Sequence, residues 1–285
     1  MRYDIAIIGA GPAGISAAIT AKVRNKNIVL IDKKNVSEKV TKAHEICNYP
    51  GLIDVAGADL AAAYEKQLAS MQISRIYKQV SQIYAMGDYY AIQLEGDMLE
   101  ATTVILATGM TVGKMLPGEA EFLGRGVSYC ATCDGQFYRG KNIAVVGETT
   151  EAREEVRYLA EMAESVWYFP EYADEHVFDD MEHVHVCQEK ATGIEGGMKA
   201  NRLVTEDKTY EVDGIFLLRE HIAASQLVPG LAMENQSIAV NLQMETNLPG
   251  CFACGDVAGK PYQYIKAAGQ GNVAALSAVS YLNKK

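Results

Sequence analysis

Cysteine provides the reactive chemistry of this chain, and four of its six cysteines fall into two pairs with Cys-x-x-Cys spacing. The first pair is Cys130 and Cys133, in the segment Cys-Ala-Thr-Cys-Asp-Gly. Two sulfurs at this spacing can form a disulfide, so one thiol can attack a partner's disulfide and the other can resolve the mixed disulfide. The first pair therefore predicts a redox-active dithiol.

Two other interpretations of the cysteines stay open. A structural zinc site needs four ligands, and the second pair, Cys251 and Cys254, could complete one. An inert buried pair is the other alternative. We expect no metal, because the second pair lies at the end of a short strand, where core residues are typical; an auxiliary redox role is also open. The single cysteines, Cys47 and Cys187, are expected to be small buried apolar groups.

A glycine-rich segment near the start of the chain predicts a dinucleotide site. It reads Gly9-Ala10-Gly11-Pro12-Ala13-Gly14 and lies between an apolar strand and an Ala-rich helix. In this pattern the first glycine makes a tight turn, the second lets a pyrophosphate approach, and the third lets helix and strand pack closely. The helix N-terminus then offers N–H groups to the phosphates. Asp32 ends the next strand, where an acid can bind a ribose hydroxyl.

The alternation of strands and helices indicates an α/β protein. We expect strands at 4–9, 27–32, 103–108, 142–147, 166–169 and 251–254, and helices at 12–23, 151–163 and 264–282. A strand–helix–strand unit thus occurs twice.

The order of these elements predicts two doubly wound, Rossmann-like domains. The tail after residue 246 resembles a return to the first domain, which is therefore discontinuous. We place the dinucleotide domain at 1–111 and 246–285, and the middle domain with the dithiol at 112–245.

Four motifs, taken in order, resemble those of the low-molecular-weight thioredoxin reductases. They are Gly9 to Gly14, Ala107-Thr108-Gly109, Cys130 to Gly135, and Pro249 to Asp256, which ends in Gly255-Asp256. The resemblance runs through almost the whole chain. It implies that FAD is the cofactor, with its pyrophosphate at the first motif, Asp256 beside its ribityl and phosphate portion, and Asn48 near the flavin. It also implies a homodimer.

The same resemblance implies separate roles within the dithiol. Cys133 is expected to face the flavin, and Cys130 is expected to attack the disulfide of thioredoxin. Asp134 matches the acid that handles protons, which is reasonable because a carboxyl beside a leaving thiolate can act as a general acid. A simple turn or helix cap is the alternative for Asp134.

The second strand–helix–strand unit departs from the family's NADPH site. Its turn reads Gly147-Glu148-Thr149-Thr150-Glu151-Ala152, so a threonine replaces the glycine that would let a pyrophosphate approach. Residues 158–189 contain nine acids and no Lys or Arg, and Pro170-Glu171-Tyr172 stands where the family has a basic cluster. In lacking these motifs the chain resembles the ferredoxin-dependent flavin thioredoxin reductases of anaerobes.

We therefore predict an enzyme that passes electrons from ferredoxin through FAD and the Cys130/Cys133 dithiol to thioredoxin. An NAD(P)H-dependent disulfide reductase with an atypical nucleotide site is one alternative. A non-catalytic flavin redox sensor is the other.

Charge and hydropathy limit the partners. A formal net charge of −10 argues against nucleic acid, and no apolar run is long enough to span a membrane. The N-terminal residues enter a strand without a signal-peptide pattern, so we expect a cytoplasmic protein.

The charged residues are divided unevenly along the chain. Residues 112–245 hold 11 Lys and Arg against 24 Asp and Glu, whereas the remainder holds 15 Lys and Arg against 12 Asp and Glu. An acidic ferredoxin is thus expected to dock on the first domain, at Lys22, Arg24 and Lys26 or at Lys33, Lys34, Lys39 and Lys42.

Overall fold

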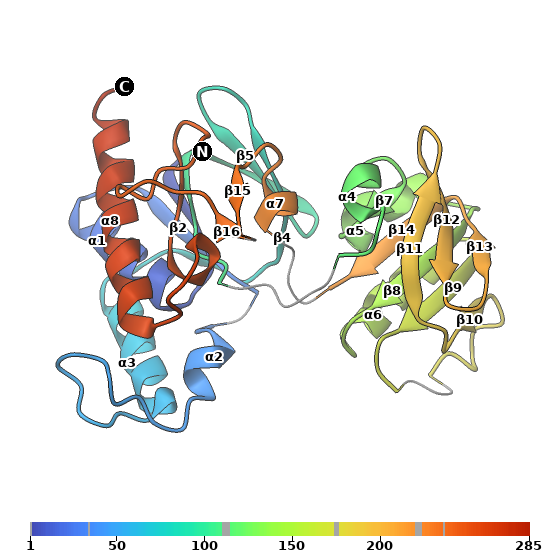
Figure 1. Ribbon diagram of the computed structural model, residues 1–285, viewed down its shortest axis with the longest axis horizontal. Helices are drawn as coiled ribbons and strands as arrows, with labels where there is room; N and C mark the ends of the chain where they lie inside the picture. Colours follow the sequence, from blue (N-terminus) through green and yellow to red (C-terminus); the bar gives the residue numbers. More distant parts are fainter. Residues whose placement is uncertain (1, 34, 110–114, 174–176, 220–223, 236) are drawn as a thin grey trace. The chain divides into compact units, whose positions relative to one another are not determined.

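The computed structural model describes residues 2–33, 35–109, 115–173, 177–219, 224–235 and 237–285. Its contacts divide the chain into two compact units (Figure 1). Unit 1 comprises Met1–Thr111 and Ala223–Lys285, and unit 2 comprises Val112–Ile222. The prediction of an α/β fold with two Rossmann-like units, the first discontinuous in sequence, is confirmed.

A largely parallel sheet forms the centre of unit 1. Its strands are β1 (Tyr3–Ile8), β2 (Ile28–Ile31), β3 (Arg75–Ile76), β4 (Val80–Ala85), β5 (Tyr90–Leu94), β6 (Asp97–Leu106) and β17 (Cys251–Ala253). They follow the order β3-β2-β1-β6-β5-β4, and β17 also pairs with β6 in parallel. The continuous apolar runs of β1 and β2 suit strands that are buried on both faces.

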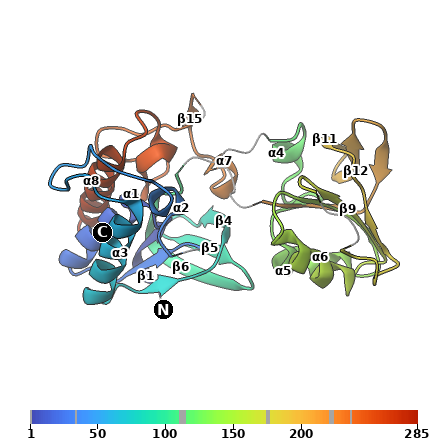
Figure 2. The same cartoon turned by 90° about the horizontal axis from the view of Figure 1, so that it is seen from below.

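Two long helices lie side by side in unit 1, α1 (Pro12–Val23) and α8 (Tyr264–Leu282) (Figures 1 and 2). Small residues allow this close approach: a Cβ placed on Gly271 would lie 2.0 Å from the carbonyl oxygen of Ala13. The remaining helices of the unit are α2 (Glu38–Thr41), α3 (Gly57–Ser70), α7 (Ala224–Leu227) and the 3-10 helix η2 (Gly255–Ala258). Packing α8 on α1 brings the C-terminal part of the chain back to the glycine-rich turn.

The second crossing between the units lies earlier in the chain than the sequence predicts. The expected boundary was near residue 245, but Ala223–Lys285 belongs to unit 1. This segment contains α7 and the strands β15 (Met233–Glu234) and β16 (Ser237–Ile238), and it bonds to unit 1. The Gln82 side chain donates to the carbonyl oxygen of Gln226 at 2.9 Å, and the Asn247 side chain donates to that of Gly230 at 2.8 Å.

Unit 2 contains a parallel sheet and a smaller antiparallel one. The parallel order is β10-β9-β8-β14-β7, and the antiparallel order is β11-β12-β13. The elements are α4 (Glu119–Phe122), β7 (Val127–Ser128), α5 (Ala131–Asp134), η1 (Gly135–Tyr138), β8 (Asn142–Gly147), α6 (Ala152–Ala160), β9 (Ser165–Pro170), β10 (Val184–Val186), β11 (Ala191–Gly196), β12 (Ala200–Thr205), β13 (Thr209–Glu211) and β14 (Gly214–Leu218). Helices α5 and α6 lie together on one face of the parallel sheet, and β11 and β12 lie on the other (Figure 2).

Within the part of the chain that the structure describes, no helix is both long enough and apolar enough to cross a membrane.

Candidate flavin and dithiol sites

Two glycines of the first turn are required by the fold itself. Gly9 has φ +110°, and a Cβ there would lie 2.3 Å from the carbonyl oxygen of Ala107. A Cβ on Gly14 would lie 1.8 Å from the carbonyl oxygen of Gly9. Both positions therefore bring backbone segments closer together than any other residue permits.

Gly11 is different, because a Cβ there would make only an ordinary van der Waals contact. Its φ of −82° and ψ of −179° suit any residue, and the nearest atom to a Cβ there would be that of Ser37 at 3.8 Å. Gly11 caps α1, and Pro12 opens that helix. The first N–H groups of a helix lack intrahelical acceptors, so an anion can bind here.

Asp32 is held at this turn by a backbone contact. Its carboxylate accepts a hydrogen bond from the N–H of Ala10 at 2.6 Å, and its own N–H donates to the carbonyl oxygen of Ile76 at 3.1 Å. The acid predicted from sequence spacing therefore lies beside the glycines, at the ends of β1 and β2.

The predicted residues of β6 and β17 come to the same edge of the sheet. The N–H of Ala107 donates to the carbonyl oxygen of Ile8 at 2.8 Å, and Gly109 follows two residues later. Gly255 has φ +82°, and a Cβ there would lie 2.9 Å from that of Ala13, so the turn leading into Asp256 lies against α1. Among the residues that the structure describes, none offers a hydrogen-bond partner to the buried hydroxyl of Thr108.

A buried polar atom without a partner indicates a ligand, because such groups are nearly always satisfied. The open turn at Gly11, the positioned Asp32 carboxylate and the Thr108 hydroxyl together fit a dinucleotide. They gather at the carboxyl ends of parallel strands, where ligands of this fold class bind.

Lys266 and Asn48 support this edge through contacts that the sequence did not reveal. The ammonium group of Lys266, on α8, donates to the carbonyl oxygens of Gly255 at 2.8 Å and Gly259 at 2.6 Å. Burial lowers the pKa of Lys266, although the Asp256 charge opposes that shift. Asn48 donates to the Gln263 side chain at 2.6 Å, so this predicted residue is tied to the residue that precedes α8.

The first cysteine pair forms a disulfide in unit 2. The Cα atoms of Cys130 and Cys133 lie 5.3 Å apart. Cys130 caps α5, and its sulfur accepts a hydrogen bond from the N–H of Cys133 at 3.2 Å, with the Thr132 hydroxyl 3.5 Å away. These contacts would favour a thiolate at Cys130 once the bond is reduced, because hydrogen bonds to a charged form stabilise it.

Asp134 reaches the dithiol through a serine. The Ser128 hydroxyl donates to the Asp134 carboxylate at 2.6 Å, and it also accepts from the N–H of Cys130 at 3.1 Å. Burial, and then the Asp134 charge, raise the pKa of nearby Tyr138. Both roles considered for Asp134 are compatible with this position, so its role in proton transfer stays a prediction.

The two sulfur-bearing residues differ in exposure. Cys130 is only 6% exposed, whereas Cys133 is half-buried. The hydrogen bond from the Cys133 N–H to the Cys130 sulfur would stabilise a thiolate at Cys130. Cys133, in contrast, is the more exposed of the two residues. The assignment of Cys130 to the partner and Cys133 to the flavin therefore stays a prediction.

The second pair has the same spacing and a different structure. Cys251 and Cys254 are free and buried, and burial raises the pKa of each thiol to about 12. Cys251 lies in β17 and Cys254 continues with an extended backbone, which separates their Cα atoms by roughly 10 Å. A disulfide needs Cα atoms less than about 7 Å apart, so this pair belongs to the core.

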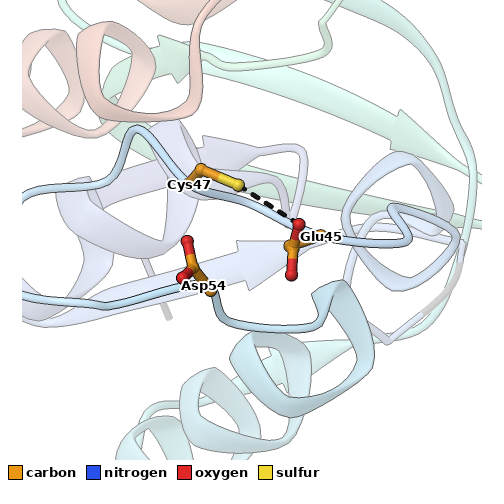
Figure 3. Close-up of side chains that lie close together, drawn as sticks. All are labelled: Glu45, Cys47 and Asp54. Carbon is orange, nitrogen blue, oxygen red and sulfur yellow. Dashed lines mark hydrogen bonds between the residues drawn. The ribbon is translucent and has the colours of Figure 1, made fainter.

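The single cysteines do not both fit the sequence expectation. Cys187 is half-buried, but Cys47 is exposed, so the prediction of a buried Cys47 is wrong. Figure 3 shows the Cys47 thiol directed at the Glu45 carboxylate, with Asp54 close by. A hydrogen bond to Glu45, and further contributions including Asp54, raise the pKa of Cys47 to about 11. Cys47 is therefore a weak nucleophile at neutral pH.

The second glycine turn, in unit 2, packs against the protein's own side chains. A Cβ on Gly147 would lie 2.8 Å from the Tyr168 hydroxyl, which shares a 2.5 Å hydrogen bond with that of Tyr172. The Arg153 guanidinium lies over the Tyr172 ring. Acidic residues also stand at the start of α6, with Glu151 at the cap and Glu154 and Glu155 in the first turn.

Comparison with known proteins shows the family of this chain. Residues 3–271 match the family model described as pyridine nucleotide-disulphide oxidoreductase. The chain belongs to this family. It is 33% identical over 306 residues to a thioredoxin reductase of Helicobacter pylori, covering 98% of each chain. The chain is thus a flavin-dependent disulfide oxidoreductase of the thioredoxin reductase type.

Solved structures give a more specific likeness. A ferredoxin-flavin thioredoxin reductase from Clostridium acetobutylicum is 47% identical, with a TM-score of 0.86, covering 100% of this chain and 98% of that chain. A thioredoxin reductase from Gloeobacter violaceus is 29% identical, with a TM-score of 0.76 and coverage of 99% and 95%. The resemblance inferred from the four motifs is confirmed.

Proposed function

We propose that this protein takes electrons from reduced ferredoxin into bound FAD, passes them to the Cys130–Cys133 disulfide, and reduces thioredoxin. The observation that carries the choice of donor is the Gly147 turn of unit 2. There Tyr168 packs against the turn, and glutamates surround the start of the following helix. A nicotinamide dinucleotide would meet Thr149 in place of the glycine that lets a pyrophosphate approach, and like charge, which repels its phosphates.

FAD is the flavin that best fits unit 1. A dinucleotide needs phosphate contacts at a helix start and an acid for its ribose, and Gly11 and Asp32 supply these positions. We place Gly9, Pro12, Ala13 and Gly14, together with Asn48, Ala107, Thr108, Gly109, Gly255 and Asp256, around the same cofactor. A bound flavin can accept electrons singly and deliver a pair to a disulfide, which suits a one-electron donor.

The residues of unit 2 then provide thiol chemistry. The Cys133 amide and the Thr132 hydroxyl stabilise a thiolate at Cys130. That thiolate attacks one sulfur of the partner's disulfide, and Cys133 resolves the mixed disulfide by attacking Cys130. Asp134, held by Ser128, is placed to exchange protons with the dithiol.

The docking surface for ferredoxin is proposed on unit 1. With the corrected boundary, unit 1 holds 15 Lys and Arg against 14 Asp and Glu, and unit 2 holds 11 against 22. Lys33, Lys39 and Lys42 are exposed, and the N–H of Ser37 donates to the carbonyl oxygen of Ala10 at 3.1 Å. This second basic cluster therefore adjoins the dinucleotide turn; Lys34 lies outside the described residues.

The first basic cluster, at the end of α1, is tied to other parts of unit 1. Lys22 donates to the carbonyl oxygen of Gln72 at 3.5 Å, and Lys26 donates to the side chain of Asn283 at 3.1 Å. The first basic cluster serves as the matched control for the second cluster.

We also expect a homodimer and a cytoplasmic location. Light scattering tests the oligomeric state, and cell fractionation tests the location.

The deciding experiment mixes the purified, flavin-loaded protein anaerobically with reduced ferredoxin, NADPH or NADH, and follows flavin bleaching. Ferredoxin should bleach the flavin and support steady reduction of thioredoxin, while neither nucleotide should do so at micromolar concentration. Lys39→Glu with Lys42→Glu should slow bleaching by ferredoxin more than Lys22→Glu with Arg24→Glu, and added salt should lessen that difference. Rapid bleaching by NADPH would contradict the donor, and flavin reduction without thioredoxin turnover would favour a sensor.

A further inference from the structure

A closed ring of three hydrogen bonds joins the dithiol segment to the neighbouring acid in unit 2. The Ser128 hydroxyl donates to the Asp134 carboxylate at 2.6 Å and accepts from the N–H of Cys130 at 3.1 Å. The N–H of Asp134 donates to the carbonyl oxygen of Cys130 at 3.2 Å, which closes the ring. Asp134 is thus bonded to this segment through both its side chain and its main chain.

The Ser128 hydroxyl has one hydrogen and two acceptors within reach. The carbonyl oxygen of Cys130 lies 3.3 Å away, and the Asp134 carboxylate lies 2.6 Å away. The carboxylate takes the hydrogen, because hydrogen bonds to a charged acceptor are shorter and stronger than those to a neutral one. The lone pairs of the same oxygen remain available to the N–H of Cys130.

The sheet of unit 2 fixes Ser128 in place. This residue lies in β7, paired in parallel with Phe216 of β14, and is 4% exposed. A buried hydroxyl that lost its partners would cost free energy, because no solvent would replace them. Asp134, at the end of α5, is only half-buried, so its carboxylate can turn towards solvent. Ser128 therefore decides where the carboxylate points.

The ring does not depend on the redox state of the dithiol. Its bonds run through main-chain groups, one hydroxyl and one carboxylate, and none of the three uses a sulfur atom. The hydrogen bond from the Cys133 N–H to the Cys130 sulfur, in contrast, involves an atom whose bonding changes in every turnover. Opening the disulfide thus breaks no bond of the ring.

We propose that Ser128 is a positioning residue that holds the Asp134 carboxylate at the dithiol in both redox states, so that this carboxylate can carry a proton between sulfur atoms. The proposal rests on the proposed function, in which Asp134 exchanges protons with the dithiol. It adds the group that keeps the carboxylate in place while the sulfurs separate and rejoin.

The proton follows the bond changes of thiol–disulfide exchange. When the reduced dithiol meets a disulfide, the Cys130 S–H bond and the partner's S–S bond break, and a mixed disulfide forms. The proton that Cys130 loses passes through the carboxylate to the departing sulfur, which leaves as a thiol. Cys133 then attacks Cys130, so two thiols are oxidised to a disulfide and the partner's disulfide is reduced to two thiols.

The choice of disulfide probe isolates this proton transfer. An alkyl thiolate leaves slowly unless it gains a proton, whereas an aromatic thiolate with a low pKa leaves readily without one. Hydroxyethyl disulfide therefore needs the carboxylate, and an aromatic disulfide serves as the insensitive probe. Both are small molecules, so no protein partner is required.

The test uses the flavin-loaded full chain and the variants Ser128→Ala, Ser128→Thr, Asp134→Asn, and Ser128→Ala combined with Asp134→Asn. Thr205→Val supplies a matched control in the same unit. Thr205 is also 4% exposed, and its hydroxyl donates to the carbonyl oxygen of Lys208 at 2.9 Å and accepts from the N–H of that residue at 3.1 Å.

The disulfide is first reduced chemically without oxygen, and the excess reductant is removed. A single oxidation of the dithiol by each probe is then followed, by acid quench and thiol counting for the alkyl probe and by absorbance for the aromatic one. Thermal melting of each variant reports on the fold.

We expect Ser128→Ala to slow the alkyl reaction by roughly tenfold and Asp134→Asn to slow it by roughly 100-fold, since general acid–base catalysis contributes about 10²–10⁴-fold. In the Asp134→Asn background, Ser128→Ala should change the rate by less than about twofold, because both act through one carboxylate. Ser128→Thr keeps the hydroxyl and should recover most of the loss. The aromatic reaction should change by less than about twofold in every variant. Thr205→Val should lower the melting temperature without slowing either reaction.

An alkyl rate in Ser128→Ala equal to that of the parent would overturn the proposal. So would equal slowing of both reactions, a folded Ser128→Thr as slow as Ser128→Ala, or a full additional loss in the combined variant, because each of these means a structural effect alone. If Asp134→Asn itself reacts as fast as the parent, the proton role in the proposed function fails, and the proposal fails with it.

Discussion

Replacing Gly11 by serine should separate cofactor binding from folding. The backbone at Gly11, with φ −82° and ψ −179°, suits serine, and nothing closer than 3.8 Å would meet the new Cβ. Serine is also a favoured helix cap, so the cofactor-free protein should keep its stability or gain a few tenths of a kcal/mol. The side chain would instead occupy the space through which a pyrophosphate approaches.

The expected loss of affinity follows from the contacts at stake. Hydrogen bonds to charged groups contribute about 1.5–3 kcal/mol each, so losing two costs roughly 3–6 kcal/mol. Because each 1.4 kcal/mol is about tenfold in affinity, FAD binding should weaken by at least ~100-fold. Titration of the cofactor-free protein with FAD, followed by flavin fluorescence, measures this change.

Two other glycine variants serve as controls. Gly14→Ala should damage folding itself, because its Cβ would lie 1.8 Å from the carbonyl oxygen of Gly9. Gly269→Ala, on an exposed part of α8 with nothing within 4 Å, should leave FAD binding unchanged and stabilise the helix by about 0.5–1 kcal/mol. If Gly11→Ser binds FAD as tightly as the parent, the phosphates do not approach at Gly11 and the site is wrongly placed.

Three further predictions concern single side chains. In Cys133→Ser, Cys130 should trap thioredoxin as a mixed disulfide visible by non-reducing electrophoresis; trapping only by Cys130→Ser would reverse the roles. Cys251 and Cys254 keep their protons up to about pH 12 in the folded state, while unfolded thiols ionise near 8.5, so unfolding free energy should fall as pH rises between those values. Urea unfolding at pH 7 and 9.5 should show a smaller fall in Cys251→Ala with Cys254→Ala. Finally, Lys266→Met should weaken FAD binding by roughly tenfold, because the two charge-assisted hydrogen bonds that hold the Gly255 turn are lost, and Lys266→Arg should weaken it less. Equal affinities would show that the Gly255 turn needs no such support.

Local patterns explain what could be predicted from the sequence. The glycine turn, its strand and helix, and Asp32 lie within a few elements, and each residue has a reason that depends on its neighbours in sequence. The same holds for Cys130 and Cys133, whose spacing decides their chemistry. The fold class followed from such units repeated along the chain.

Features that depend on distant contacts could not be predicted. The Glu119 carboxylate accepts a hydrogen bond from the Arg219 guanidinium at 2.8 Å, yet these residues are 100 positions apart and neither stands in a recognisable motif. The position of the second crossing depends on contacts such as that between Gln82 and Gln226, which leave no local signal. The usual burial of single cysteines likewise predicted a buried Cys47, whereas that residue is exposed.

The chain contains two versions of one strand–turn–helix design, and their difference indicates what unit 2 is for. In unit 1 the second position of the turn is Gly11, which leaves room for a ligand. In unit 2 that position is Thr149, and Tyr168 packs against Gly147 from the neighbouring strand. The parallel sheet remains intact beneath this turn. A sheet whose turn has lost the glycine that admits a pyrophosphate but kept its core still provides a rigid support, and the group that it supports is the Cys130–Cys133 disulfide.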